Sequence, residues 1–364
     1  MILQGALTIE TSHENQFKRS PALRKGRLTI LVPAYNEEKS IGDTIRSLKA
    51  QTLPVDEIIV IDDVSSDNTA AVARALGVTV MTPEKNTGSK AGAQNYALER
   101  VDTEFTMAID ADTILAPDAI EKLMAAFEDK SIAAACGFVI PRYVKTVWER
   151  GRYIEYLFAF AFFKQIQDYF GKPLISSGCF SAYRTDILKA NGGWSTRTLA
   201  EDMDLTWSFY QSGYGVKFIP EAVCYPIEPE NFAFMSKQLK RWSHGFVQNV
   251  MLHWEGIRNI KYLNYMITVL FWDGAVASIV YLILLPLLMV LTQNPLFLIG
   301  YVIDIPAILV PTLYIGLKRG EALKVLASVP GYFVLRTVNG IFLLEAMWTE
   351  LVLKKSFKTY EKGH

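Results

Sequence analysis

Carboxylates gather directly after short apolar runs of the chain. Asp62-Asp63 ends one such run, and Asp110-Ala-Asp112 ends another. A third run, Leu28–Val32, leads into the polar segment Pro33-Ala-Tyr-Asn-Glu-Glu38. Carboxylate oxygens suit Mg²⁺ or Mn²⁺, which also favour phosphate oxygens and water. The pattern therefore predicts a ligand held by hydrogen bonds and by a hard cation.

The elements that must position these groups alternate between strand and helix patterns. Apolar runs of strand length occupy Leu28–Val32, Glu57–Ile61, Val78–Val80 and Phe105–Ile109. Helical patterns fill the segments between them, at Ile41–Leu48, Ala70–Leu76 and Lys90–Glu99. This alternation predicts βαβ units, and hence an α/β fold with a mostly parallel sheet and flanking helices. Ligands of such sheets lie beyond the carboxyl ends of the strands, where the carboxylates are found.

The Asp-x-Asp pattern alone identifies nothing, because it also occurs at Asp202 and Asp204. Position distinguishes Asp110 and Asp112, which follow an apolar strand. Side chains at i and i+2 of an extended strand point the same way. Without that context, a solvated pair of loop carboxylates is the simpler interpretation.

Composition excludes several classes of protein. Lys+Arg and Asp+Glu both number 37, so no excess of positive charge is present to bind nucleic acid. Apolar residues make up 51%, too many for a disordered chain. No Gly-x-Gly-x-x-Gly follows the first strand and no P-loop motif occurs, which argues against dehydrogenases and P-loop NTPases. The three cysteines lack Cys-x-x-Cys spacing, which predicts neither a zinc site nor a disulfide framework and favours a reducing compartment.

Apolar residues are concentrated towards the end of the chain. Between Tyr262 and Leu317 the only charged residues are Asp273 and Asp304, and about 20 apolar residues suffice for a membrane helix. The chain therefore divides into a polar N-terminal tail (1–26), a cytosolic domain (27–260), a membrane domain of two to three hydrophobic helices (261–353) and a basic tail (354–364). Basic residues before the first crossing and after the second favour a cytosolic position for the large domain.

Two crossings are expected, at Met266–Leu291 with a kink at Pro286, and at Leu296–Leu317. A third apolar segment, Val325–Leu344, contains Pro330 and Arg336, and we expect it to be interfacial, re-entrant or broken. Asp304 and Arg336 lie at apparent membrane depth, where ionisable groups are costly, so we expect them to pair or to line a sugar path. Alternatively, Asp304 lies at a helix break close to the membrane interface.

Six motifs in a fixed order resemble those of the family 2 glycosyltransferases. The motifs are Val32-Pro-Ala-Tyr-Asn-Glu-Glu38, Asp62-Asp63, Lys90-Ala-Gly92, Asp110-Ala-Asp112, Glu201-Asp202 and Gln238-Leu-Lys-Arg-Trp242. The likeness is to the membrane-embedded branch, which includes cellulose, chitin, hyaluronan and poly-N-acetylglucosamine synthases. It covers residues 28–245, and its most specific motif is Gln-x-x-Arg-Trp, typical of polymer-forming members.

The sequence departs from this family at two points. Val64 stands where members often have glycine after the two aspartates, which puts the geometry of that turn in question. Many polymer synthases carry transmembrane helices before the catalytic domain, and none is predicted here. A polymer channel would then need helices from another subunit.

The resemblance implies a nucleotide-sugar-binding (GT-A-like) fold and an inverting transfer from a UDP-sugar. The donor-binding residues that it implies are Pro33, Tyr35, Glu37, Asp62, Lys90, Asp110 and Arg241. It implies Asp112 as the ligand of Mg²⁺ or Mn²⁺ and Asp202 as the general base that takes the proton of the acceptor hydroxyl. The acceptor-binding residues that it implies are Ser177, Gly178, Gln238 and Trp242.

Several of these residues have a purely structural alternative. Asp62 and Asp63 would cap the helix that follows them, and Asp202 would cap a helix at Leu205–Tyr210. Lys90 would be a surface lysine at a helix start, and Trp242 an anchor at the membrane interface. The aromatic-rich stretch Tyr153–Phe170 fits either an interfacial helix or a buried core helix.

We expect a membrane-anchored, metal-dependent glycosyltransferase that extends a β-linked polysaccharide from UDP-N-acetylglucosamine or UDP-glucose. The nearest alternative is the transfer of one sugar to a lipid acceptor, giving a glycolipid or polyprenyl intermediate. The expected partners are the nucleotide-sugar donor, the polysaccharide or lipid acceptor, membrane lipid and further membrane subunits, with no nucleic acid. Intact Asp112, Asp202 and Arg241 argue against a non-enzymatic scaffold, and the absence of an internal repeat argues against a transporter.

Overall fold

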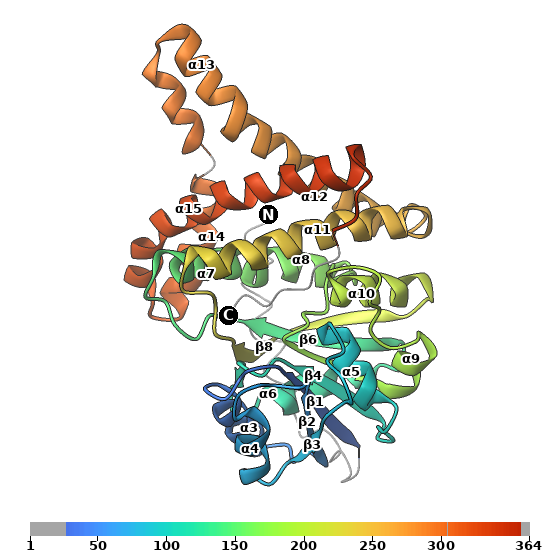
Figure 1. The fold of residues 1–364 in the computed structure, drawn as a ribbon. Coiled ribbons are helices and arrows are strands. Elements are labelled where there is room, and N and C mark those ends of the chain that lie inside the picture. Colours follow the sequence, from blue (N-terminus) through green and yellow to red (C-terminus); the bar gives the residue numbers. More distant parts are fainter. Residues whose placement is uncertain (1–26, 304, 358–364) are drawn as a thin grey trace, which may run out of the picture.

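The computed structural model describes residues 27–303 and 305–357, with an eight-stranded sheet below a layer of long helices (Figure 1). The predicted tail 1–26 and residues 358–364 of the basic tail lie outside the described residues. The strands are β1 (Leu28–Ala34), β2 (Glu57–Asp62), β3 (Thr79–Met81), β4 (Phe105–Ile109), β5 (Ile114–Leu115), β6 (Ile132–Val139), β7 (Phe180–Arg184) and β8 (Gly215–Tyr225).

Helices cover the sheet and extend beyond it. In the first 260 residues they are α3 (Ile41–Lys49), α4 (Thr69–Ala75), α5 (Lys90–Leu98), α6 (Ala119–Met124), α7 (Val147–Phe158), α8 (Lys164–Tyr169), α9 (Thr185–Ala190), α10 (Glu201–Gln211) and α11 (Phe232–Ile257). The later helices are α12 (Lys261–Ile279), α13 (Leu285–Thr292), α14 (Ile305–Lys318) and α15 (Ala322–Met347). Short 3₁₀ segments (Ala125–Glu128, Pro295–Tyr301) and π turns (Ala159–Phe163, Val280–Leu284, Trp348–Val352) join them.

The predicted βαβ half of the fold is confirmed. Strand order is β3-β2-β1-β4-β7-β6-β8-β5, and the first four strands pair in parallel. The other half makes the sheet mixed, because β7 pairs antiparallel with both β4 and β6, and β5 pairs antiparallel with β8. The carboxyl ends of β1, β2 and β4 therefore meet at one edge, where the sequence places its polar segments.

Both faces of the sheet are buried, each in its own core. Alternate residues of β1 point to opposite faces, so Ile30 and Val32 join the core beneath α3 and α6, while Leu31 joins the core beneath α5 and α10. This double burial explains why the parallel strands are continuous apolar runs without polar alternation. It also gives the polar edge a rigid support.

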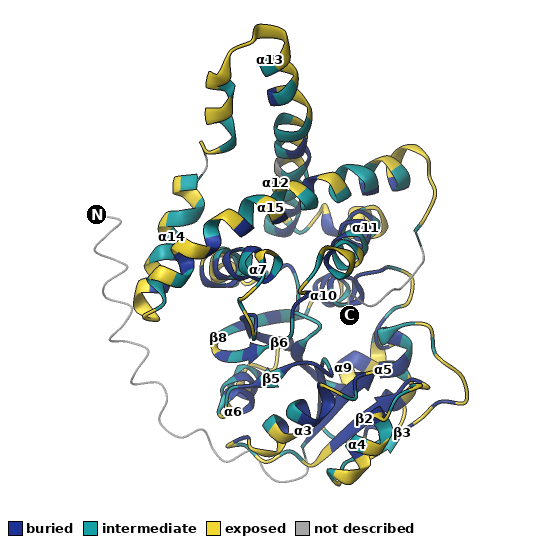
Figure 2. Cartoon of the chain, turned by 60° about the vertical axis from the view of Figure 1, so that its left-hand side comes forward, coloured by how far each residue is buried: buried dark blue, intermediate teal, exposed yellow. Residues whose placement is uncertain are grey.

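Within the described residues, three helical segments are long and apolar enough to cross a membrane: Lys261–Thr292, Pro295–Lys318 and Ala322–Val352. In both views α12 and α13 lead away from the sheet domain, on the side opposite β3 (Figures 1 and 2). Pro286 lies in the first turn of α13, after the π turn Val280–Leu284, and the kink predicted there stays a prediction. The boundary at residue 260 stays a prediction.

Helix α15 runs unbroken through Pro330, so the expectation of a broken segment is wrong. It packs along α7 and α11, across the top of the sheet domain (Figure 1). The guanidinium of Arg336 lies over the ring of Tyr281 at 4.0 Å. Asp304, its predicted partner, lies outside the described residues.

The aromatic-rich stretch Tyr153–Phe170 is buried in its first half, as the core-helix alternative predicts, while its position at a membrane interface stays a prediction. Its first half, on α7, buries Tyr153 and Leu157 in the core. Its second half, the π turn Ala159–Phe163 and α8, exposes Phe162 and Tyr169, and Phe170, just after α8, stacks on Tyr262 at the start of α12. Aromatic side chains of that kind suit a membrane–water interface.

Candidate active site

The ends of β1 and β2 bring the predicted donor-binding residues side by side. Pro33 lies opposite Ile61, and Ala34 lies opposite Asp62. The backbone N–H of Asp63 donates to the carbonyl of Ala34 at 2.9 Å, which extends the pairing by one residue. Asp62 is buried and Tyr35, just past β1, is exposed. A buried carboxylate beside an exposed aromatic ring can bind a flat polar ligand such as a nucleobase.

Glu37 is buried within the loop that follows β1. Its backbone N–H donates to the hydroxyl of Thr69 at 2.7 Å, and its carboxylate accepts from the hydroxyl of Ser40 at 2.6 Å. These contacts join the β1 loop to the start of α4 and to the residue before α3. Glu37 therefore holds the loop in shape, and its part in donor binding stays a prediction.

The two aspartates after β2 do different things, and neither caps the following helix, so the capping alternative is wrong. Asp62 accepts from the backbone N–H of Ser65 at 3.3 Å, whereas α4 begins after Asn68. Both oxygens of Asp63 bind Thr87, from its N–H at 2.8 Å and its hydroxyl at 3.0 Å. Asp63 thus fixes the loop that leads into α5 and Lys90.

The turn after these aspartates contains Val64, the residue whose place puts the turn geometry in question. Val64 has φ of 62°, in the left-handed region where β-branched residues are rare. The valine therefore adopts a backbone conformation that favours glycine, at the cost of local strain.

Lys90 is the centre of a charged cluster drawn from four elements. Its ammonium pairs with the carboxylate of Asp110, at the end of β4, and donates to the carbonyl of Gly178 at 2.9 Å. The backbone N–H of Gly178 donates in turn to Oδ2 of Asp202 at 2.9 Å. Only 11% of the Lys90 side chain is exposed, so it is not a surface lysine. The chain of contacts joins predicted donor, acceptor and catalytic residues in one place.

Gly178 lies where a side chain would not fit without displacing its neighbours. A Cβ at this position would stand 3.2 Å from both the Asp202 carboxylate and the Lys90 ammonium. The glycine therefore lets the backbone pass directly between the two charged groups. This close approach explains the glycine in a segment that also supplies Ser177.

Asp202 lies inside the first turn of α10. The helix begins at Glu201 after Ala200, so the alternative in which Asp202 caps a helix at Leu205–Tyr210 is wrong. Its Oδ1 accepts from the N–H of Met203 at 2.8 Å. A carboxylate in the first turn is favoured by the positive end of the helix dipole. Each oxygen keeps a second lone pair that can accept a substrate proton.

Glu201 is buried beside this cluster and has a pKa above its usual range. Burial is the main cause, and the charge of Asp202 adds to it, while the positive charges of Lys90 and Arg241 oppose it. Arg241 also donates to the carbonyl of Leu199 at 3.4 Å. Lys90 and Arg241 thus lie close to two carboxylates, Glu201 and Asp202. The sequence predicted a role for Asp202 but none for Glu201.

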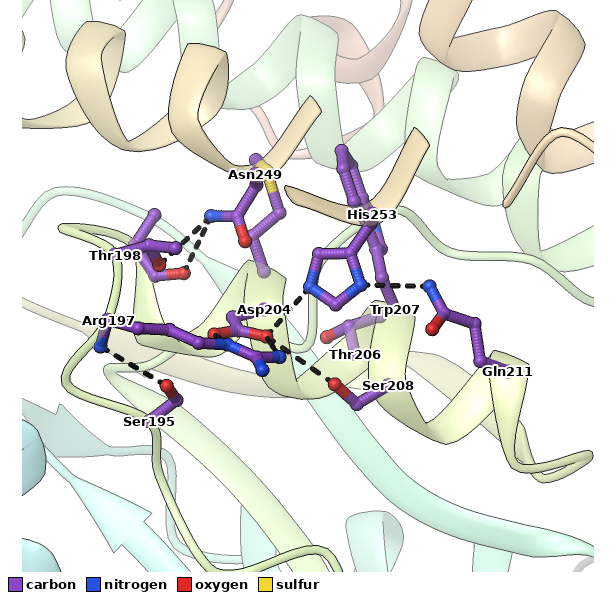
Figure 3. Close-up of polar contacts among 12 residues, drawn as sticks. Ser195, Arg197, Thr198, Asp204, Thr206, Trp207, Ser208, Gln211, Asn249 and His253 are labelled. Carbon is purple, nitrogen blue, oxygen red and sulfur yellow. Dashed lines mark hydrogen bonds and ion pairs between the residues drawn. The ribbon is translucent and has the colours of Figure 1, made fainter. Parts of the chain in front are cut away.

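Helix α11 holds the loop that precedes α10. The side-chain carbonyl of Gln248 accepts from the N–H of Leu199 at 3.1 Å. The amide of Asn249 donates to the carbonyl of Ala200 at 3.1 Å and to the hydroxyl of Thr198 at 3.3 Å (Figure 3). The helix that carries Arg241 therefore also fixes the start of the helix that carries Asp202.

The two aspartates of the second Asp-x-Asp pair, Asp202 and Asp204, have different surroundings. Asp204 is buried and lies in a network with Arg197, at 2.6 and 2.8 Å, and with Nε2 of His253, at 2.7 Å (Figure 3). Burial opposes its ionisation, but the bonds from Arg197 and His253 outweigh it and lower its pKa to about 2. Nδ1 of His253 contacts Gln211 at 2.8 Å. Asp204 is therefore a structural anchor, and only Asp202 of the pair joins the charged cluster.

The predicted acceptor residues contact buried cations that sequence reasoning missed. The hydroxyl of Ser177 accepts from Lys164 at 2.9 Å. The carbonyl of Gln238 accepts from Arg152 at 2.6 Å, and the Arg152 guanidinium lies 4.5 Å from the Trp242 ring centroid. Trp242 is half-buried, which fits a packed side chain better than a membrane anchor. An arginine among the aromatic residues of this stretch marks Arg152 as unusual, but it does not indicate which distant residues the arginine contacts.

Asp112 is nine-tenths buried and accepts from the hydroxyl of Thr113 at 3.1 Å. Among the described residues, no group of three or more His, Cys, Asp or Glu side chains could hold a metal. Asp110, two residues earlier, is paired with Lys90. The protein therefore offers one carboxylate, Asp112, as a metal ligand, and phosphate oxygens would have to supply the others. That combination fits a hard cation brought in with a nucleoside diphosphate.

Known proteins share sequence and fold with this chain. Residues 29–192 match the family model described as Glycosyl transferase family 2. The chain is 30% identical over 275 residues to a poly-beta-1,6-N-acetyl-D-glucosamine synthase of Staphylococcus epidermidis, covering 73% of this chain and 66% of the relative. It is also 30% identical over 223 residues to the enzyme of that name from Staphylococcus aureus, covering 60% of this chain and 54% of the relative. The matched segment thus spans between about half and two thirds of these relatives' length.

Among solved structures, the fold is similar to that of a mannosyltransferase from Pyrobaculum calidifontis, which was solved in complex with GDP-Man and Mn²⁺. The TM-score is 0.62 and the match covers 96% of this chain and 95% of that one. At 19% identity the likeness concerns the fold alone. It extends over the sheet domain and the later helices together.

Proposed function

Because this chain belongs to glycosyltransferase family 2, we propose that it is a membrane-anchored inverting glycosyltransferase. It transfers a sugar from a UDP-sugar to a growing β-linked polysaccharide, with the sheet domain in the cytosol. The observation that carries the proposal is the continuous contact from Asp110 through Lys90 and Gly178 to Asp202. The names of the relatives favour UDP-N-acetylglucosamine as the donor.

The donor lies at the carboxyl edge of β1, β2 and β4 in this proposal. Tyr35 and Asp62 hold the uracil and Asp110 holds the ribose, while Lys90 lies close to the phosphates. Asp112 would hold Mg²⁺ or Mn²⁺ together with the diphosphate, and the cation would act there as a Lewis acid on the leaving group. Support comes from the buried carboxylates at these three strand ends.

The transfer itself uses Asp202 and Arg241. Asp202 accepts the proton of the acceptor hydroxyl through a free lone pair of its carboxylate, and the hydroxyl oxygen attacks the anomeric carbon. The bond from that carbon to the diphosphate breaks on the opposite side, so an α-linked donor gives a β-linked product. Arg241 supplies fixed positive charge for the departing diphosphate. Arg241 lies on α11, the helix that also holds the 198–200 loop before α10. The position of Arg241 relative to Asp202 is therefore fixed.

Product sizing tests this proposal. The full chain, purified in detergent or nanodiscs, is given UDP-N-acetylglucosamine or UDP-glucose with Mn²⁺, and the products are sized by mass spectrometry. A ladder of β-linked oligosaccharides is expected with one donor. The addition of a single sugar to a co-purified lipid would show that the acceptor is a lipid and not a growing polysaccharide. No UDP release with either donor would refute the proposed activity.

A further inference from the structure

Arg152 is a fully buried cation on α7, at 0% exposure. Its guanidinium pairs with the carboxylate of Glu155, one turn along the helix, and Nε lies 3.2 Å from Oε2 of Glu228, in the loop before α11. Burial alone would lower the pKa of Arg152, but the neighbouring carboxylates raise it above its usual range. The site therefore holds a permanent positive charge that two carboxylates match.

Arg152 contacts both ends of the Gln238–Trp242 element. Nη2 donates to the side-chain carbonyl of Gln238 at 2.6 Å, and the guanidinium lies over the Trp242 ring at 4.5 Å. Residues four apart lie on one face of a helix, so one guanidinium reaches both. It also lies 5.4 Å from the Tyr156 ring centroid. A planar cation over an aromatic ring favours one orientation of that ring as well as one distance.

The side chain of Gln238 is engaged inside the protein. Its carbonyl accepts from Arg152 at 2.6 Å. A buried cation thus engages the oxygen of this amide. A ring that the guanidinium covers on one face can stack on a sugar only with its other face. Of the two predicted acceptor residues on α11, Trp242 is the one that keeps a group for a ligand in this arrangement.

We propose that Arg152 is a positioning residue for acceptor binding. Its guanidinium fixes the Trp242 ring by direct contact and, through its hydrogen bond to Gln238, holds the same face of α11 in place. This inference rests on the proposed function and deepens it. It reassigns Gln238 from a sugar ligand to a part of the support. Helix α15 completes that support, because the amide of Asn339 donates to Glu155 at 3.0 Å.

Arg152→Lys tests the inference, since it keeps the charge but loses the planar fork that contacts Gln238 and Trp242. Kinetics are measured in the full chain with UDP-N-acetylglucosamine and a short β-1,6-linked N-acetylglucosamine oligosaccharide as acceptor. We expect the KM for the acceptor to rise about tenfold, in line with a desolvated cation–π contact. The KM for the donor, and UDP release without acceptor, are expected to be unchanged. Arg150→Lys, two residues earlier on α7, is the control, because Arg150 bonds the backbone carbonyls of Lys145 and Ala327.

A second variant guards against a folding defect. Arg152→Met combined with Glu228→Gln removes the charge together with a partner, so no unmatched charge is left buried between them. Its thermal midpoint identifies the folded protein, which should again show a raised KM for the acceptor and shorter products. In a double-mutant cycle, Arg152→Lys and Trp242→Phe should be non-additive on acceptor kcat/KM.

Two results would overturn the inference. One is an unchanged acceptor KM in both folded variants. The other is strict additivity of Arg152→Lys with Trp242→Phe. Loss of UDP release in the wild-type chain would instead refute the proposed function, so the two failures are distinguishable.

Discussion

Replacing Gly151 by alanine should loosen the crossing between α7 and α15. A Cβ at Gly151 would lie 2.5 Å from the carbonyl oxygen of Gly331 and 2.8 Å from Cβ of Leu335. Both contacts are far inside van der Waals distance, and the nearer one is to backbone, which cannot rotate aside. The two helices would have to separate by several tenths of an ångström, and Arg152, the next residue, would move with α7.

The sign of the effect depends on two opposing quantities. Alanine gains up to about 1 kcal/mol over glycine in a helix interior. Overpacking at a backbone contact costs about 1–3 kcal/mol. Because the backbone contact cannot relax locally, we expect the overpacking cost to exceed the helix gain by about 1–2 kcal/mol and the thermal midpoint to fall by about 1–3 °C. Products should also become shorter, since Arg152 shifts.

Gly42→Ala is the matched control for this substitution. Gly42 lies in α3, and the nearest atom to an added Cβ is the flexible guanidinium of Arg46 at 3.4 Å. There the helix preference should dominate, and the midpoint should rise. Midpoints are measured by differential scanning fluorimetry of the full chain in one detergent. A rise for Gly151→Ala equal to that for Gly42→Ala would refute the reasoning.

Three further substitutions test the positioning of the site. Asp204→Asn should destabilise the fold by about 2 kcal/mol near neutral pH, because it removes the carboxylate that binds Arg197 and His253 with a pKa of about 2. A carboxylate whose pKa is lower in the folded state stabilises the protein at pH above its unfolded pKa, and this stabilisation is lost as the pH falls through the folded pKa. The difference in thermal midpoint between wild type and Asp204→Asn should therefore shrink between about pH 4 and pH 2. A difference that stays constant with pH would contradict this. Val64→Gly should raise the midpoint, because release of left-handed strain of about 1–3 kcal/mol exceeds the entropic cost of glycine, about 0.5–1 kcal/mol; a lower midpoint would disprove it. Glu350→Gln should lower the midpoint, since this buried carboxylate accepts hydrogen bonds from His244 and Gln248 on α11 and from the N–H of Phe357; an unchanged midpoint would contradict that.

The sequence predicted the first four strands to within two residues at their ends. Continuous apolar runs such as Glu57–Ile61 have strand length and end in polar residues, a pattern that local physics settles. The strands of the second half of the sheet were not predicted, because their local sequence does not distinguish a strand from a helix. β6 reads Ile-Ala-Ala-Ala-Cys-Gly-Phe-Val, a run whose alanines suit a helix equally well. Its strand state is decided by pairing with β7 and β8, which lie far along the chain.

The candidate site was predictable where a motif fixes a local geometry. Asp110 and Asp202 each follow from position at a strand end or a helix start. Contacts across the fold were not predictable, because a single sequence carries no sign of which distant side chain will face them. Arg152 is the clearest case, since nothing in its own segment indicates Gln238, 86 residues later.

UDP release by the purified chain tests most directly whether Asp202 and its cluster form one active site. Wild type, Asp202→Asn and Asp118→Asn are compared with UDP-N-acetylglucosamine and Mn²⁺, and Asp118, paired with Lys122 on α6, serves as the control carboxylate. Asp202→Asn should lower the rate about 10²–10⁴-fold with its thermal midpoint retained. Asp118→Asn should stay close to wild type. Equal rates for Asp202→Asn and wild type would contradict the active site described above.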